Sequence, residues 1–171
     1  MTYPQFRSKL LVVCWCLSAM LLVACQDRRA DKAYLKGNYE KSAKELESLA
    51  NLGDARAQYN LGVLYDQGLG VPQSDALALR WYTQAAERGE PRAQYNLGVM
   101  YMNGQGTAPD PVLAYFWFSL AVAQGESKAP AARDYVMDQM SPEQITRGQH
   151  MVMTRLQTQT GAQQRRPESA P

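Results

Sequence analysis

One pattern of apolar and polar positions occurs twice in the middle of the chain. The octapeptide RAQYNLGV begins at Arg56 and begins again at Arg92, an offset of 36 residues. Around the first copy, apolar residues fall at positions i, i+4, i+7 and i+8, namely Ala57, Leu61, Leu64 and Tyr65. This spacing places them on one side of an α-helix. The pattern therefore predicts that the chain forms the same amphipathic helix twice.

A second apolar pattern follows each copy. In the first copy its broad apolar face consists of Leu77, Trp81, Ala85 and Tyr82. Trp81 and Tyr82 align with Trp117 and Phe118 at the same offset, and we expect these aromatic pairs to fill the core rather than line a ligand pocket. Gly62, which recurs as Gly98, costs a helix about 1 kcal/mol relative to Ala. We therefore expect these glycines where a neighbouring helix approaches closely.

Residues typical of helix ends recur at the same offset. Side chains that can accept hydrogen bonds from the free amides of a first helical turn align at Asn38, Ser74 and Asp110. Prolines suited to the first helical position follow at Pro91 and Pro111. Glycines suited to the left-handed residue after a helix align at Gly53, Gly89 and Gly125. A period in the thirties is typical of stacked helix pairs, so the pattern predicts a solenoid of helical hairpins.

Residues 54–125 resemble two Sel-one-like repeats, which are relatives of the tetratricopeptide repeat. Each copy has the helix pattern Ala-x-x-x-Leu-Gly-x-x-Tyr, a Gly-x-Gly turn, and a Trp-aromatic pair before small residues and a glycine. The two turns contain Gly68 and Gly70, then Gly104 and Gly106. The resemblance implies an all-α fold, a right-handed superhelical α/α solenoid of helix-turn-helix repeats.

The same comparison divides the rest of the chain. Residues 31–53 resemble a plainer tetratricopeptide-type first unit, followed by one repeat at 54–89 and a second at 90–125. Residues 126–157 are expected to form degenerate capping helices, because end repeats need a polar outer face. Residues 158–171 have no apolar period and are predicted to be a disordered tail.

Residues 1–24 are predicted to be a bacterial lipoprotein signal peptide. Arg7 and Lys9 precede an apolar run at residues 10–24, which is short for a membrane span of about 20 residues. The run ends in LVAC, which resembles the signal in which the cysteine, here Cys25, is lipidated and becomes the new N-terminus. An ordinary secretory signal with an incidental cysteine is the alternative.

A lipidated Cys25 would make residues 25–30 a lipid-anchored N-terminus with a short tether. Gln26 follows it, in place of the aspartate that typically retains lipoproteins in the inner membrane of enteric bacteria. We therefore expect anchorage in the outer membrane, facing the periplasm. Several acyl chains on one residue would hold the protein firmly, whereas a single chain binds only marginally.

Charge and cysteine content exclude several function classes. Without residues 1–24 the chain has 16 basic residues, which is 18 minus the two in the signal, against 16 acidic ones, so its net charge is zero. A nucleic-acid-binding protein would carry a basic stripe. Cys14 and Cys16 leave with the signal, so no disulfide and no cysteine metal site is expected. We find no catalytic motif, cofactor site or metal-ligand cluster, and we expect the single histidine, His150, to be a surface residue.

The tetratricopeptide resemblance implies that the first helix of each repeat lines a concave groove for a partner. The groove-facing residues of the first repeat would be Arg56, Tyr59, Asn60, Val63, Asp66 and Gln67. Those of the second repeat would be Arg92, Tyr95, Asn96, Val99, Met102 and Asn103. In related domains an asparagine at the place of Asn60 and Asn96 hydrogen-bonds a bound peptide, but these residues could equally hold the array together. Arginines beside tyrosines would suit a peptide with acidic groups.

The sequence therefore predicts a lipid-anchored periplasmic adaptor without enzymatic activity, cofactor or metal, which binds an envelope protein or peptide and no nucleic acid. A component of exopolysaccharide export or of cell-wall remodelling is an alternative. A third is a β-lactam-binding or β-lactam-hydrolysing protein, although relatives of that kind carry a disulfide in each repeat. The pattern leaves the identity of the partner and the oligomeric state open, because a fold does not fix a function.

Overall fold

The computed structural model describes residues 37–164. The predicted signal peptide at 1–24, Cys25 and the tether at 25–30 lie outside the described residues, as does the beginning of the predicted first unit.

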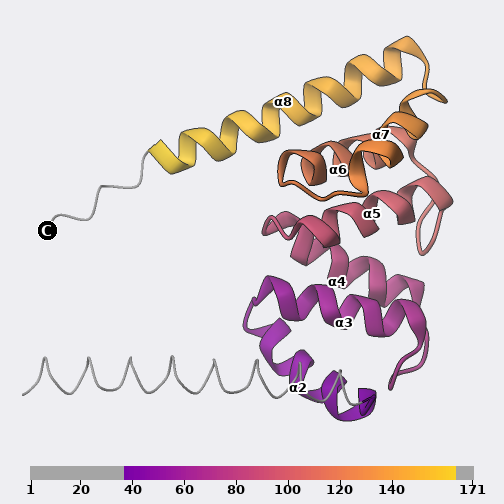
Figure 1. Cartoon of the computed structure of the whole chain (residues 1–171), viewed down its shortest axis with the longest axis vertical. Helices are drawn as coiled ribbons and strands as arrows, with labels where there is room; N and C mark the ends of the chain where they lie inside the picture. The colour runs from indigo at the N-terminus through magenta and orange to yellow at the C-terminus, as the bar shows by residue number, and fades with distance from the viewer. Residues whose placement is uncertain (1–36, 165–171) are drawn as a thin grey trace, which may run out of the picture.

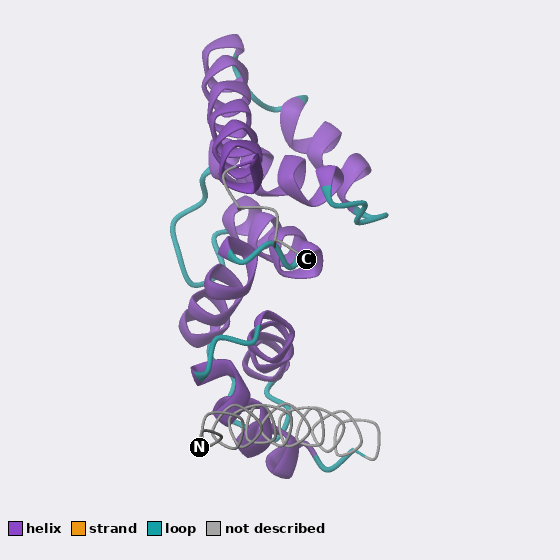
Figure 2. Ribbon diagram, turned by 90° about the vertical axis from the view of Figure 1, so that its left-hand side faces the viewer, coloured by secondary structure: helices purple, strands orange, loops and turns teal. Residues whose placement is uncertain are grey.

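The described part of the chain contains seven α-helices and no strand (Figures 1 and 2). They are α2 (Tyr39–Asn51), α3 (Ala55–Gln67), α4 (Asp75–Glu87), α5 (Pro91–Asn103), α6 (Pro111–Ala123), α7 (Ala129–Met137) and α8 (Pro142–Gln164). From α2 to α7 each helix contacts the next, so the helices form one stack along the long axis of the molecule (Figure 1). This confirms the predicted all-α solenoid, in which α3 and α4 form the first repeat and α5 and α6 the second.

The predicted helix ends are confirmed. The side chains of Asn38, Ser74 and Asp110 accept hydrogen bonds from amides of the first turns of α2, α4 and α6. At the other ends, the glycines at 53, 89 and 125 have φ angles of 90°, 88° and 83°. This left-handed conformation turns the chain out of one hairpin and into the next helix.

Gly62 and Gly98 lie where the two helices of a repeat approach closely, as the sequence predicts. A Cβ atom on Gly62 would lie 2.6 Å from Cδ1 of Tyr82, and a Cβ atom on Gly98 would lie 2.7 Å from Cδ1 of Phe118. Real Cβ atoms do not approach a ring carbon so closely, so each glycine makes room for an aromatic side chain of the second helix. Tyr82 and Phe118 are accordingly 1% and 0% exposed, which confirms their place in the core.

The Gly-x-Gly turn between the two helices of each repeat packs against the hairpin before that repeat. The second glycine of each turn lies against the first turn of the preceding second helix. A Cβ atom on Gly106 would lie 2.7 Å from the carbonyl oxygen of Asp75 in α4, and a Cβ atom on Gly70 would overlap the backbone between Tyr39 and Glu40 in α2. The turn therefore packs one repeat onto the last and does more than reverse the chain.

Helix α6 is apolar on every side because three helices cover it. It contacts α5, α7 and α8. Its buried residues include Val112, Tyr115, Phe116 and Leu120. A helix that is apolar all round is buried on all sides, and α8 provides the third side, with Met151 and Val152 packed against the core around Phe116.

Helix α8 closes the C-terminal end of the stack, and its last turns extend beyond the other helices (Figure 1). Its Arg155 Nη2 donates to the carbonyl oxygen of Glu87, 3.2 Å away in the last turn of α4. The predicted disordered tail at 158–171 is wrong for residues 158–164, because α8 continues through Gln164. Extending an existing helix costs far less than starting one, and no proline occurs between Pro142 and Pro167. No described helix is long and apolar enough to cross a membrane.

Candidate binding face

The predicted groove residues lie on the first helices of the two repeats, with the same pattern of exposure in each. In α3 the side chains of Arg56 and Gln67 are exposed, and the equivalent Arg92 and Asn103 are exposed in α5. The other predicted residues are half-buried: Tyr59, Asn60, Val63 and Asp66 in α3, and Tyr95, Asn96, Val99 and Met102 in α5. We call these twelve residues, together with Tyr135 and Ala132 of α7, the A-helix face, because the first helix of each hairpin provides them.

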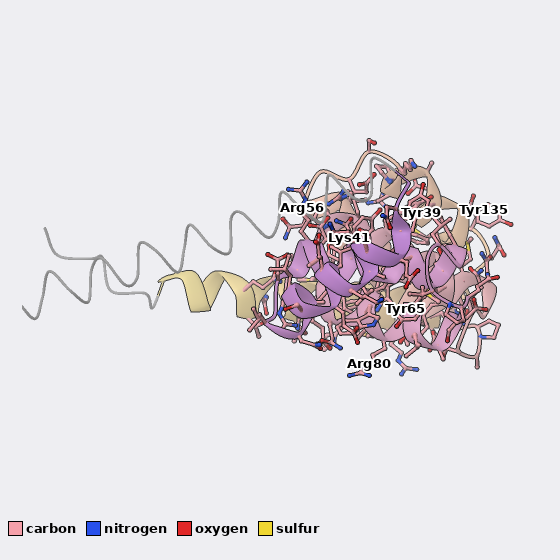
Figure 3. The ribbon with its side chains drawn as sticks, turned by 90° about the horizontal axis from the view of Figure 1, so that it is seen from below. Tyr39, Lys41, Arg56, Tyr65, Arg80 and Tyr135 are labelled. Carbon is pink, nitrogen blue, oxygen red and sulfur yellow. The ribbon has the colours of Figure 1, made fainter. Side chains whose placement is uncertain are left out.

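Seen along the stack, Arg56 and Tyr135 lie on one side of the molecule, and Arg80 of α4 lies on the opposite side (Figure 3). Tyr39 and Lys41 of α2 lie on the side of Arg56, and Tyr65 of α3 lies on the side of Arg80 (Figure 3), so both kinds of helix contribute to each side. That the first helices line a concave groove stays a prediction.

The basic end of this face is already occupied by contacts within the protein. Cζ of Arg92 lies 4.4 Å from the ring centroid of Tyr59, so it joins α5 to α3. Its Nε also donates to Oε1 of Glu90 at 2.8 Å. Such a stacked and paired arginine stabilises the array, and an acidic partner would have to compete with Glu90.

The tyrosines at the centre of the face also hold the two helices of each repeat together. The rings of Tyr59 and Tyr82 are 5.9 Å apart, and the rings of Tyr95 and Phe118 are 5.6 Å apart. These separations are typical of favourable aromatic pairs. The same tyrosines are half-exposed, so each contributes to the core and to the surface at once.

A polar cluster lies where the first repeat meets the second. The hydroxyl of Tyr82 donates to Oδ2 of Asp66 at 3.4 Å, and the side chain of Asn96 forms a second hydrogen bond to that hydroxyl. Three consecutive helices therefore meet at one oxygen atom. We call Asp66, Tyr82 and Asn96 the first junction.

Burial governs the protonation of the first junction. It raises the pKa of the Asp66 carboxyl, against the hydrogen bond from Tyr82, and the negative charge of Asp75 raises it further. Burial also raises the pKa of Tyr82 above its ordinary range, with the charge of Asp66 as the next cause. Tyr82 therefore stays a neutral donor, and Asp66 is a carboxylate whose charge is poorly compensated.

The equivalent positions of the second repeat are apolar. Met102, Phe118 and Ala132 stand 36 residues after Asp66, Tyr82 and Asn96. Phe118 belongs to a buried core against which Met102, Val99 and Ala132 pack. We call Met102, Phe118 and Ala132 the second junction.

Two glutamines of the octapeptide bind the preceding helix, which the sequence pattern did not indicate. Gln58 and Gln94 are each 1% exposed. Their Nε2 atoms donate to the carbonyl oxygens of Ala50 at 2.9 Å and Ala86 at 3.2 Å, in the last turns of α2 and α4. The same carbonyl oxygens also accept from the amides of Gly53 and Gly89 at 3.0 Å, so each glutamine adds a second hydrogen bond at the end of the preceding helix. A polar residue repeated on the apolar side of both helices was the available signal.

The described residues hold no group of three or more His, Cys, Asp or Glu side chains that could bind a metal ion. His150 is exposed on α8, as the sequence predicts. The A-helix face itself presents tyrosine rings, amides, the half-buried carboxylate of Asp66 and two exposed arginines.

The Sel1 repeat model matches residues 55–90 and residues 91–126. No curated protein sequence matches the chain. Among solved structures, a protective antigen of uropathogenic Escherichia coli strains with an SLR fold has a TM-score of 0.75 and 23% identity, over 87% of this chain and 34% of that chain. A Sel1 repeat protein from Oxalobacter formigenes has a TM-score of 0.60 and 34% identity, over 63% of this chain and 44% of that chain.

This chain thus spans less than half the length of either similar structure. The first likeness concerns the fold alone. Sel1 repeat proteins generally mediate protein–protein interaction, and their fold is typically a non-catalytic scaffold. With two matched repeats and the stacked helical hairpins described above, the chain is a Sel1-like repeat protein.

Proposed function

We propose that this protein is an adaptor of the bacterial cell envelope that binds a segment of a partner protein on its A-helix face. The observation that supports this proposal is the pattern of half-exposed side chains at matching positions of α3 and α5, among them Tyr59, Tyr95, Val63 and Val99. Aromatic side chains are enriched at protein interfaces, because they bury a large area at little entropic cost.

The adaptor is proposed to be anchored in the outer membrane through lipid on Cys25, facing the periplasm. The sequence LVAC and the following Gln26 support this part of the proposal. Cells are grown with an alkyne-tagged fatty acid, and the wild type is compared with Cys25→Ser. We expect label on the wild type only and release of the variant from the outer-membrane fraction. An unlabelled wild type would contradict the anchor without affecting the binding face.

The binding face is tested by photo-crosslinking of the full-length protein in cells. A photoreactive amino acid is placed at Gln67 or Asn103, which are exposed on the A-helix face, and in the control at Arg80, on the opposite side. We expect one partner to be captured from the first two positions and not from the third. Capture from Arg80 alone would show that the face is wrongly chosen.

The identity of the captured protein separates the alternatives. An export channel would place the adaptor in exopolysaccharide export, and a murein enzyme would place it in cell-wall remodelling. A nitrocefin assay on the purified protein tests β-lactam hydrolysis, and we expect no turnover.

A further inference from the structure

The two junctions give the A-helix face two different chemical environments, one in each repeat. Asp66 in the first junction is a half-buried carboxylate. Its hydrogen bond from Tyr82 is long, at 3.4 Å, and none of the ion pairs among the described residues includes it. The other charge that acts on it is a second carboxylate, Asp75.

Asp66 has no basic residue close to it in the sequence. Between residues 57 and 79 the sequence contains Asp66 and Asp75 and no Lys or Arg, and between residues 93 and 127 it contains no Lys or Arg. Asp66 also lies in the last turn of α3, where the helix dipole attracts positive charge. The basic residues of the face lie far from the helix end that carries Asp66. Arg56 is in the first turn of α3, and Arg92 is in the first turn of α5.

The second junction presents an apolar surface one repeat further along. Met102 replaces the carboxylate, and Val99 is half-exposed beside it. On α7, Tyr135 is 60% exposed and stands 36 residues after Val99. A methionine beside aliphatic and aromatic groups forms an adaptable apolar contact surface.

We propose that the partner segment is an extended peptide that crosses from α3 to α5 and presents a Lys or Arg side chain to Asp66 and an apolar side chain to Met102. This inference rests on the binding face proposed above. A cation at Asp66 compensates a carboxylate that has no cationic partner among the described residues. The chemistry differs from the acidic peptide that the sequence suggests, because Arg92 is already paired with Glu90.

The spacing of the two side chains follows from the stack. The contact between Arg92 and Tyr59 joins α3 to α5 through a long side chain, while each of these helices packs closely on α4. Closely packed helices are about 8–10 Å apart, which is the lower bound for α3 and α5, and an extended chain advances about 3.3 Å per residue. The basic and the apolar residue of the partner should therefore be at least about three positions apart.

The test is a selection of short random peptides, displayed on yeast, against the full-length protein. Two grafted variants use each repeat as the control for the other. Asp66→Met with Tyr82→Phe and Asn96→Ala copies the second junction into the first. Met102→Asp with Phe118→Tyr and Ala132→Asn copies the first junction into the second.

The wild type should enrich peptides with Lys or Arg followed, or preceded, by an apolar residue at least about three positions away. The first graft should lose the preference for a basic residue, and the second should replace the apolar preference by a basic one. Circular dichroism checks that each variant remains helical. Because a triple variant can unfold, Asp66→Asn is tested alone, and it should weaken binding of the selected peptides about tenfold.

Two results would overturn the inference in different ways. Selected peptides without a basic preference, or with one that Asp66→Asn leaves unchanged, would refute the ligand chemistry and leave the binding face intact. No enrichment by the wild type, or enrichment that is lost with Arg80→Glu and kept when Tyr95 and Val99 are changed to Ala, would refute the binding face as well.

Discussion

The first and second junctions occupy the same place in two repeats that share an octapeptide, yet one is polar and the other is apolar. Both have a glycine that admits an aromatic ring, at Gly62 and Gly98, and the two rings are equally buried. What differs is the atoms around the end of the ring, a carboxylate and an amide in one case and Met102 with Ala132 in the other. The comparison shows that the packing of a repeat and the chemistry of its surface are set by different positions.

The largest expected effect concerns what the junctions share. Tyr82→Ala and Phe118→Ala each remove a fully buried ring and should lower the free energy of unfolding by about 3–5 kcal/mol. Urea unfolding followed by circular dichroism measures this. Tyr135→Ala, at a ring that is 60% exposed, is the matched control and should change stability by no more than about 0.5 kcal/mol. A small loss for only one of the buried rings would mean that the two junctions are not packed alike.

Adding a methyl group at the close approach should also affect both repeats equally. Gly62→Ala and Gly98→Ala force the aromatic ring to move, which costs about 1–3 kcal/mol, partly offset by about 1 kcal/mol of helix propensity. Thermal unfolding should show a net loss for each. Combining Gly98→Ala with Phe118→Leu should lose less than the sum of the single changes, because the smaller side chain leaves room for the methyl group. Strict additivity would argue against the close approach.

Exchanging a single hydroxyl should separate the junctions. Phe118→Tyr buries a hydroxyl between Met102 and Ala132, where it lacks a partner, and should destabilise the protein by about 1–3 kcal/mol. Adding Ala132→Asn should recover part of this loss. The reverse change, Tyr82→Phe, removes the hydroxyl that donates to Asp66 and should cost about 1 kcal/mol. Equal costs for the two changes would contradict the assigned difference in polarity.

The smallest effect is a dependence on pH that only the first junction should show. The pKa of Asp66 is raised above its ordinary value of 3.8, so the native state binds this proton more tightly than the unfolded chain. Stability should therefore fall as the pH rises through the raised pKa, and the charged form at neutral pH should be unfavourable for folding.

Asp66→Asn keeps the size of the side chain and removes its charge. The variant should melt at a higher temperature than the wild type at pH 7, and the difference should shrink as the pH falls through the raised pKa towards 3.8, below which Asp66 is protonated in both states. The readout is a series of thermal melts across this range for both proteins. A difference that does not vary with pH would assign the effect to shape and not to charge.

The repeat frame could be predicted from the sequence because its causes are local. Glycines with a left-handed backbone and side chains such as Ser74 act on the next few residues, and Gly62 in a helix indicates a close neighbour by its poor helix propensity alone. The sequence pattern did not indicate that α8 covers one side of α6, whose residues are apolar on every side. The third covering surface of α6 comes from residues that carry no repeat pattern.

The candidate site was only partly predictable. Exposure of the first-helix residues follows from the repeat, and all twelve are exposed or half-buried on α3 and α5. That they line a concave groove stays a prediction. The pairing of Arg92 with Glu90 and Tyr59, and the meeting of three helices at the hydroxyl of Tyr82, depend on distances between helices that a linear pattern does not contain. Whether these residues bind a partner stays a prediction, as do the lipid on Cys25 and the location in the outer membrane.

The way one hairpin is joined to the next has a consequence for how such a chain can change in length by gene duplication. Each repeat brings the glutamine that hydrogen-bonds to the end of the helix before it and the turn glycine that lies on that helix's first residues. A duplicated segment of 36 residues, inserted in phase between α4 and α5, would therefore carry both halves of its new joints. Recombination between the two copies of RAQYNLGV would insert or delete such a segment in phase, while α8 would continue to close the end.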